Sequence, residues 1–245
     1  MLNERATDRQ ERIEGFSQPV LLGAKILQAG AGASGNEAGH VGALVGVDYT
    51  LYADMDTVET SNLSRTTLFT KDDVGRPKAS LAAERAQAMN IADGKCDSFT
   101  GDICHGLGEG VIRRMDVVMG CLDNDQTRIF LQDVCIKLGK PYIDTGIGSL
   151  DWNVFTSSGK PECACLMCTM SQDDENKALA RVRNSCDVTR KKAAAAGKIP
   201  TIVTSAAMVG GKAVEEAIRV LHQCKEPDGM FTRRYPPEYS TMHLY

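Results

Sequence analysis

Gly30-Ala31-Gly32-Ala33-Ser34-Gly35 is a glycine-rich stretch that follows an apolar run at residues 24–29. After it, from 36 to 44, small and apolar residues recur at the spacing of a helix. A strand, a glycine-rich turn and a helix in this order form the setting in which G-x-G-x-x-G binds a nucleotide. The glycines let the backbone approach phosphate oxygens, and the N–H groups at the helix start carry partial positive charge. The sequence therefore predicts a nucleotide site at this turn.

An acidic residue follows the next predicted strand, at 50–53. Asp54 lies nineteen residues after Gly35, close to the position where a carboxylate meets a ribose hydroxyl in such a unit. One residue of the first strand, Gln28, is unusual, because a strand buried on both faces of a parallel sheet is normally apolar.

Strands and helices alternate along much of the remaining chain. Strands are predicted at 115–120 and 141–144, and helices at 78–89, 126–138 and 200–223. This alternation predicts an α/β fold with a doubly wound, mostly parallel, Rossmann-like sheet and right-handed crossovers. Ligands of such sheets bind at the carboxyl ends of the strands, where the glycine stretch, Asp54 and Asp123 fall.

The domain organisation is expected to be simple. The 245 residues suit one large nucleotide-binding domain, which we predict over 23–245 after a polar N-terminal helical arm at 1–22. The composition of the arm favours a solvated amphipathic helix. Between 149 and 198 the pattern loosens, and we expect a crossover segment that runs over one face of the sheet. In the last helix, Gly210-Gly211 would permit close packing, and the residues expected to point inward are Met208, Val209, Ala213, Ala217, Ile218 and Leu221.

The composition narrows the classes of partner and location. Apolar residues make up 42% and charged residues 24%, which is typical of a globular protein. The net charge of −4 provides no basic surface for nucleic acid or anionic lipid, so we expect neither as a partner. No apolar run is long enough to span a membrane, and the charged N-terminus lacks the apolar core of a signal peptide. Nine cysteines, an odd number, without an export signal predict reduced thiols and a cytoplasmic protein.

Several short motifs occur in a fixed order along the chain. After the glycine stretch come Asp54-Met-Asp56, Asn62-Leu-Ser-Arg65, Gly75-Arg-Pro-Lys78 and Cys121-Leu-Asp123-Asn124 with Thr127-Arg128. In this order and spacing the chain resembles the ubiquitin-activating-enzyme-like adenylyltransferases, the ThiF/MoeB group. The resemblance extends from Arg9-Gln10 to the helix that ends near Leu221.

The resemblance implies an activity and a partner. Members of this family adenylate the C-terminal carboxylate of a small ubiquitin-like or sulfur-carrier protein, using ATP and Mg²⁺. The partner implied is such a protein with a Gly-Gly C-terminus. A later transfer of the activated carboxylate to Cys186 is left open.

The resemblance also implies roles for individual residues. Gly30, Gly32 and Gly35 would lie against the ATP phosphates, and Asp54 would hold the ribose, with Asp56 in the same nucleotide-binding motif. Arg9 matches an arginine that family dimers insert into the partner's site, so we expect a homodimer. The residues that would contact the triphosphate are Asn62, Arg65 and Lys78, and the residue that would bind Mg²⁺ is Asp123.

The chemistry of these residue types agrees with the resemblance. A carboxylate that attacks the α-phosphorus of ATP is already an anion at pH 7 and needs no general base. It needs neutralisation of the triphosphate charge and alignment of the attacking and leaving oxygens. Arginine offers a planar fork to phosphate oxygens, lysine a compact charge and aspartate a hard ligand for Mg²⁺.

Other interpretations stay open. For the glycine stretch with Asp54 alone, a dinucleotide-dependent dehydrogenase would be the default, but cationic Arg65 and Lys78 suit a triphosphate better. Arg65 and Lys78 could also be surface ion-pair residues, and Asp123 with Asn124 could cap the next helix. The substrate could instead be a peptide or small-molecule carboxylate, adenylated without a thioester stage. A nucleotide-binding scaffold without turnover is a further alternative.

A cysteine pair, Cys165 and Cys168, has the spacing of zinc ligands. The family often completes such a site with a second C-x-x-C near the C-terminus, which this chain lacks. Cys163 and Cys224 are the candidates for the remaining ligands of a partial zinc site. Whether the chain binds a structural Zn²⁺ or binds none is therefore left open.

The remaining cysteines fall into two groups. Cys186 lies roughly where relatives carry a cysteine that accepts the activated carboxylate or sulfur. Nearby Arg183 and Arg190 would favour its thiolate, and a passive loop cysteine is the alternative. Cys121 and Cys135 are expected to be packing residues.

Overall fold

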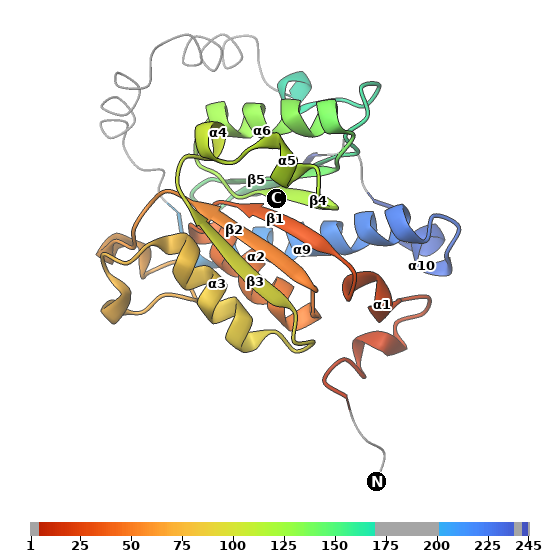
Figure 1. The fold of residues 1–245 in the computed structure, drawn as a ribbon, viewed down its shortest axis with the longest axis horizontal. Coiled ribbons are helices and arrows are strands. Elements are labelled where there is room, and N and C mark those ends of the chain that lie inside the picture. The colour runs from red at the N-terminus through yellow and green to blue at the C-terminus, as the bar shows by residue number, and fades with distance from the viewer. Residues whose placement is uncertain (1–4, 170–200, 238–241, 245) are drawn as a thin grey trace.

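The computed structural model describes residues 5–169 and 201–237, and the backbone of one further strand at 242–244. In this part of the chain, the strands form one sheet of seven in the order β3-β2-β1-β4-β5-β6-β7 (Figure 1). The first five strands pair in parallel, whereas β6 and β7 are antiparallel to their neighbours. The strands are β1 (Lys25–Ala29), β2 (Tyr49–Asp54), β3 (Lys95–Thr100), β4 (Val117–Gly120), β5 (Tyr142–Ile147), β6 (Trp152–Ser157) and β7 (Met242–Leu244). The predicted doubly wound, mostly parallel sheet is confirmed.

Helices cover both faces of the sheet (Figure 1). One face packs against α2 (Ala33–Val45), α3 (Lys78–Met89) and α9 (Val203–Lys225). The other packs against α4 (Ile103–Gly106), α5 (Glu109–Ile112) and α6 (Asp125–Leu138). Side chains alternate between the faces, so that Ile26 joins the core under α9 and Leu27 joins the core under α6. Among the described helices, none combines the length and the apolar character needed to cross a bilayer.

Helix α9 crosses α2 closely at one glycine. A Cβ on Gly210 would lie 2.5 Å from the Cβ of Glu37, so no larger residue fits there. A Cβ on Gly211 would meet no heavy atom of the structure within 4 Å, so the predicted close packing holds for Gly210 only. The expected inward position of Met208 is wrong, because its side chain is 58% exposed. The stripe at residues 209, 213, 217 and 221 faces the sheet, and Met208 lies outside it.

The crossover expected at 149–198 is wrong over its first part. Residues Trp152–Ser157 form β6, which pairs with β5 along its whole length. Thr156 and Ser157 are buried in this strand. Because they are polar, the sequence shows no continuous apolar run here, and the strand was not predicted. The rest of the expected crossover includes residues 170–200, which lie outside the described residues.

The N-terminal arm is not a single solvated helix. It contains a 3-10 turn, η1 (Gln10–Arg12), and a four-residue helix, α1 (Gln18–Leu21). Val20 and Leu21 are buried in the core between the sheet and α9. The predicted solvated arm did not include this buried contact, because two adjacent apolar residues are too few to show helical periodicity.

A buried histidine joins the arm to the C-terminal helices. His222 of α9 is fully buried, and its ring packs against Phe16 and against Phe231 of α10 (Met230–Arg234). Its Nδ1 lies 2.8 Å from the carbonyl oxygen of Ile218, and its Nε2 accepts a hydrogen bond from the backbone N–H of Ser17 at 3.1 Å. These contacts fit the neutral ring with the proton on Nδ1. Burial lowers the pKa of His222, against the raising effects of the Ile218 carbonyl and Glu226.

We expect this histidine to make stability fall in mild acid. The unfolded chain takes up a proton at about pH 6.5, whereas the folded chain keeps His222 neutral to lower pH. The free energy of unfolding should therefore decrease as the pH drops from about 7.5 to 5.5, and His222→Phe should reduce this slope. Urea unfolding across that range is the measurement, with exposed His105→Gln as the matched control. A slope that His222→Phe leaves unaltered would contradict this assignment.

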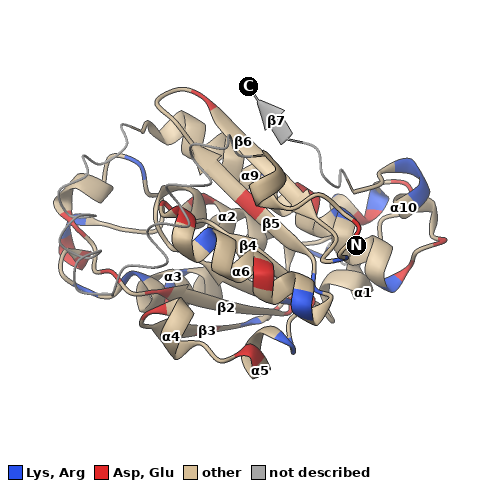
Figure 2. Ribbon diagram, turned by 90° about the horizontal axis from the view of Figure 1, so that it is seen from above, with Lys and Arg blue, Asp and Glu red and all other residues tan. Residues whose placement is uncertain are grey.

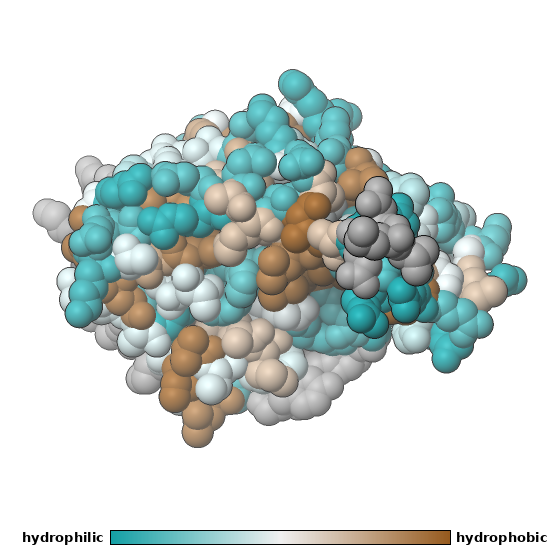
Figure 3. Space-filling model, turned by 90° about the horizontal axis from the view of Figure 1, so that it is seen from below, coloured by the Kyte–Doolittle hydropathy of each residue, from teal (hydrophilic) through white to brown (hydrophobic). Residues whose placement is uncertain are grey.

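The exposed residues on the face seen in Figure 3 are of mixed character. On the side seen in Figure 3, hydrophobic atoms gather in separate patches among hydrophilic ones. Acidic and basic residues are intermixed along the described ribbon (Figure 2).

Candidate functional site

The glycine turn connects β1 to α2, and its glycines have different functions. Gly30 has a φ of +97°, and a Cβ there would overlap the carbonyl oxygen of Cys121. A Cβ on Gly35 would overlap the carbonyl oxygen of Gly30. A Cβ on Gly32, at the N-cap of α2, would meet no heavy atom of the structure within 4 Å. Gly30 and Gly35 are thus required by packing, and Gly32 borders open space at a helix N-terminus, where phosphate fits.

The buried amide of Gln28 explains its place in β1. Its Nε2 donates hydrogen bonds to the carbonyl oxygens of Gly30, at 3.2 Å, and Gly35, at 2.8 Å. Both acceptors lie in the glycine turn, so Gln28 holds the carbonyls of the turn toward the sheet. Carbonyl oxygens turned inward do not repel an anion at the outer side of the turn.

Asp54 connects the end of β2 to the same turn. Its Oδ2 accepts a hydrogen bond from the backbone N–H of Ala31 at 2.7 Å, and its Oδ1 accepts one from Asp56 at 2.8 Å. Burial raises the pKa of Asp54, while Lys78 and the two backbone N–H groups lower it. Each oxygen keeps a lone pair for a further donor, as a ribose hydroxyl would require.

Lys78 begins α3 and lies beside the acidic end of β2. Its Nζ is 3.0 Å from Oδ2 of Asp56, and its backbone N–H donates to the Asp56 carbonyl at 2.9 Å. The Lys78 side chain is only 10% exposed, whereas that of Asp56 is 63% exposed. Lys78 is therefore an ion-pair residue whose own side chain is mostly buried, and its charge acts on Asp54.

The segment with Asn62 and Arg65 follows β2. Asn62 is buried, and its Oδ1 accepts a hydrogen bond from the N–H of Glu59 at 2.9 Å, which caps the turn η2 (Thr60–Asn62). Arg65 donates from Nη1 to the Ser61 carbonyl at 2.5 Å. These contacts organise the segment itself, so the contacts of Asn62 and Arg65 with a triphosphate stay a prediction.

Asn36 of α2 attaches this segment to the glycine turn. Its Nδ2 donates to the Ala31 carbonyl at 3.2 Å, and its Oδ1 accepts from the N–H of Leu68 at 2.6 Å. Asn36 is fully buried, so both bonds form away from water. Sequence reasoning missed this bridge, because its two partners lie far apart in the chain.

Asp123 follows β4, whose end lies beside β1. Its side chain is exposed and makes no hydrogen bond or ion pair with any residue in the described part of the chain. The neighbouring Asn124 caps α6, since its Oδ1 accepts from the Thr127 N–H at 2.8 Å. The cap is thus Asn124 alone, and Asp123 remains available as a hard oxygen ligand. Mg²⁺ needs few protein ligands when the phosphates of a substrate supply the others, so the single carboxylate of Asp123 fits this ion.

A buried ion pair connects helix α6, which follows Asp123, to strand β5. The guanidinium of Arg128 binds the carboxylate of Asp144, with its Nε 3.0 and 3.2 Å from the two oxygens and a further bond from Nη2. The Tyr142 hydroxyl donates to the same carboxylate at 2.9 Å. Sequence reasoning gave Asp144 no role, although a carboxylate within a predicted buried strand was a signal, because a buried charge needs a partner.

The described cysteines do not assemble a zinc site. Cys165 and Cys168 lie with their sulfurs 3.5 Å apart, and burial raises the pKa of Cys165. No group of three or more His, Cys, Asp or Glu side chains among the described residues could hold a metal ion. Cys163 contacts the Ser158 hydroxyl, so the described residues complete no zinc site and a structural Zn²⁺ stays a prediction.

The other cysteine predictions have different outcomes. Cys121 and Cys135 are buried, and burial raises the pKa of each to about 12, which confirms them as packing residues. Cys186, with Arg183 and Arg190, lies outside the described residues.

Arg9 is exposed in the N-terminal arm. The next residue, Gln10, donates to the carbonyl of Val45 at the C-terminal end of α2. The glycine turn is at the opposite end of this helix, about 18 Å away by helix rise. The structure therefore does not bring Arg9 to the turn of its own chain, and its insertion into a partner's site stays a prediction.

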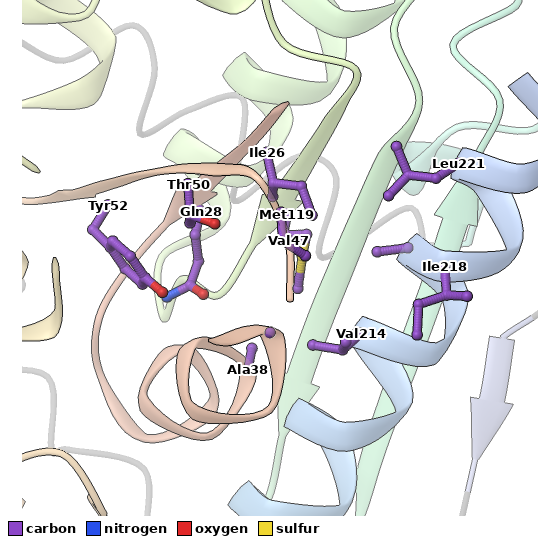
Figure 4. Close-up of a pocket in the computed structure, with 12 residues that line it drawn as sticks. Ile26, Gln28, Ala38, Val47, Thr50, Tyr52, Met119, Val214, Ile218 and Leu221 are labelled. Carbon is purple, nitrogen blue, oxygen red and sulfur yellow. The ribbon is translucent and has the colours of Figure 1, made fainter. Parts of the chain in front are cut away.

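A small pocket lies between the sheet and helices α2 and α9 (Figure 4). Gln28 and Tyr52 line one side of it, and Ile218 and Leu221 line the other. None of the predicted site residues lines it, so it is a gap in the core rather than the nucleotide site. The complete lining is Ile26, Gln28, Ala38, Gly42, Val47, Thr50, Tyr52, Met119, Val214, Ala217, Ile218 and Leu221.

Comparison with known proteins gives the family of this chain. The model of the ThiF family matches residues 7–241. The chain belongs to the ThiF family. The predicted resemblance, which rested on the order of the motifs, is confirmed.

Individual relatives agree with the ThiF assignment. The chain is 33% identical over 137 residues to a sulfur carrier protein adenylyltransferase of Thermus thermophilus, covering 56% of this chain and 50% of that protein. It is 28% identical over 175 residues to the sulfur carrier protein ThiS adenylyltransferase of Escherichia coli, covering 71% and 66%. It thus spans half to about two thirds of these relatives.

Solved structures share the fold. A crystal structure of E. coli MccB with AMPCPP and MccA superposes with a TM-score of 0.71 at 18% identity, covering 99% of this chain and 71% of that one. At this identity the likeness supports the ThiF fold and carries nothing about substrate.

The glycine turn allows a test by substitution. Gly35→Ala should destabilise the fold by at least about 2 kcal/mol, because its methyl group would overlap a backbone carbonyl. Gly32→Ala should cost no more than about 1 kcal/mol, because its methyl group would enter open space. Chemical denaturation of the two variants is the measurement. Equal losses would show that the space at Gly32 is not open in solution.

Proposed function

We propose that this chain uses ATP and Mg²⁺ to adenylate the C-terminal carboxylate of a small ubiquitin-like or sulfur-carrier protein. One observation carries the proposal: the groups suited to a nucleotide triphosphate lie at the carboxyl ends of adjacent strands. Asp54 is hydrogen-bonded to the glycine turn, and Lys78 lies beside Asp56 at the end of β2. Asp123 follows β4, which pairs with β1 directly before that turn.

The reaction needs positioning rather than proton transfer. A carboxylate oxygen of the partner forms a bond to the α-phosphorus of ATP, and the bond to the pyrophosphate oxygen breaks with its electron pair. The products are an acyl-adenylate and pyrophosphate. The attacking carboxylate is already ionised, so no general base is required. The protein has to neutralise the phosphates and hold the reacting atoms in line.

Each residue has a distinct part in this proposal. Gly32 leaves room for the phosphates at the N-terminus of α2, and Asp54 accepts the ribose hydroxyls. Lys78, with Arg65 and Asn62, binds the triphosphate and stabilises the leaving pyrophosphate. Asp123 holds Mg²⁺, which when bound shields the charge of the phosphate oxygens.

The kind of partner is supported by the relatives. Those named above are adenylyltransferases of sulfur carrier proteins, and another, in Haloferax volcanii, is a SAMP-activating enzyme E1. For this chain we propose a partner ending in Gly-Gly, with Cys186 as a candidate acceptor of the activated carboxylate. We further propose that the reaction takes place in the cytoplasm, in the functional homodimer tested below.

Pyrophosphate–ATP exchange in the presence of a carrier protein tests the proposal. Asp123→Ala and Arg65→Ala should each lower the exchange rate about a hundred- to a thousandfold, as for the loss of one contact to developing charge. Exposed Asp228→Ala and Arg113→Ala are the matched controls and should keep the wild-type rate.

Three outcomes discriminate the alternatives. Undiminished exchange in both site variants would refute the mechanism. Exchange with a short peptide or small carboxylate but not with a carrier protein, and full turnover in Cys186→Ala, would favour the peptide or small-molecule substrate. ATP binding without any exchange would favour the scaffold.

The dimer hypothesis allows a complementation test. Arg9→Ala and Asp123→Ala chains should each be inactive alone, because each lacks one part of every site. In an equal mixture, half of the dimers contain one chain of each variant. Each mixed dimer has one of its two sites complete, with Asp123 from one chain and Arg9 from the other. About a quarter of the wild-type rate should therefore return. A mixture that stays inactive after subunit exchange, or an active monomer in sedimentation, would contradict the role of Arg9.

A further inference from the structure

We propose that Arg128 and Asp144 are positioning residues that fix the turn carrying Asp123, residues 121–124, next to the glycine turn. This inference rests on the proposed function, in which Asp123 binds Mg²⁺. It concerns a buried ion pair whose contacts in the described structure are with Asp125 and Tyr142 and do not include Asp123.

The ion pair fixes the start of α6. Arg128 lies in the first turn of this helix, five residues after Asp123. Its guanidinium binds both oxygens of Asp144, which is completely buried in β5. A planar guanidinium that binds a carboxylate through two bonds restricts the orientation of the helix as well as its distance. The first turn of α6 is thereby held against β5.

The other end of the Asp123 turn is held by the same strand. Thr145 donates from its hydroxyl to the carbonyl of Gly120, the last residue of β4, at 3.0 Å. The same hydroxyl lies 3.2 Å from that of Ser34, in the first turn of α2. The Tyr142 ring fills the space next to Gly120, where a Cβ would overlap its hydroxyl.

Only four residues, 121–124, separate the end of β4 from the start of α6. Both ends of this short turn are held by β5, through Thr145 at one end and Asp144 at the other. Asp123 in its middle is exposed and has no side-chain partner among the described residues, so in this part of the chain the backbone of the turn sets where its side chain starts. Replacement of residues that do not bind the metal but orient its ligand usually changes the metal affinity about 10- to 100-fold.

Asp144→Asn and Arg128→Lys test the inference with two readouts. Both substitutions approximately keep the size of the side chain, but the first removes the negative charge and the second removes the planar fork. The matched control is Lys137→Met, which breaks an exposed ion pair at the other end of α6. Tyr142→Phe removes one bond to Asp144 and serves if the stronger variants do not fold.

The first readout is amide hydrogen–deuterium exchange in the apo protein, which does not depend on activity. Exchange should accelerate at least about tenfold in residues 121–128 of the Asp144 and Arg128 variants and stay unaltered in α3. Lys137→Met should leave residues 121–128 at the wild-type rate. Unaltered exchange in 121–128, or equal acceleration throughout the sheet, would overturn the inference.

The second readout is the Mg²⁺ dependence of pyrophosphate exchange. The Mg²⁺ concentration for half-maximal rate should rise about 10- to 100-fold in Asp144→Asn, with little change in the KM for ATP. High Mg²⁺ should restore its rate but not that of Asp123→Ala, a difference that a general loss of structure would not produce. An unshifted Mg²⁺ requirement would overturn the inference. A wild-type protein without exchange activity would instead refute the proposed function, and amide exchange would still test whether the ion pair holds the turn.

Discussion

The hydrogen bond from the Ala31 amide to the Asp54 carboxylate is the contact on which the site depends. Parallel strands bring their carboxyl ends to one edge, but a bond between the loops is needed to fix those loops relative to each other. Asp54 forms this bond from the end of β2 to the turn after β1. Because burial disfavours its charge, Lys78 and the two backbone N–H groups are needed to favour the ionised form.

The site is supported by buried polar side chains that bind backbone groups. Gln28 binds two carbonyls of the glycine turn, and Asn36 connects that turn to the segment at Leu68. Such groups are costly when unpaired, and their bonds are specific in distance and direction. The buried amides of Gln28 and Asn36 therefore restrict the loops in distance and direction, which non-directional apolar packing does not. The conformation of the candidate site therefore depends on buried side chains of β1 and α2 as well as on the residues exposed at the carboxyl ends of the strands.

The fold was largely predictable, because the signals that define it are local. Helix α3 begins and ends at the predicted residues, since Gly75-Arg-Pro77 ends the preceding segment and the apolar face is regular. Strand β6 was not predictable from apolar runs, because Thr156 and Ser157 are polar residues buried in it. For the candidate site, the sequence suggested a residue only where a family motif names it, as for Asp54 and Lys78, and the roles of these two residues stay a proposal. The roles of Asn36 and Asp144 were not predicted, because they depend on Leu68 and Arg128, which only folding brings near.

The packing of Tyr142 against Gly120 has a consequence for how this sequence can change. The tyrosine ring fills the volume that any side chain at position 120 would require, and its hydroxyl is used by Asp144. The two positions therefore cannot vary independently. An alanine at position 120 requires a smaller residue at 142, and that replacement removes a donor from the buried carboxylate. In an alignment of homologues, these two columns should covary, with the acidic residue of β5 retained mainly where glycine and tyrosine occur together.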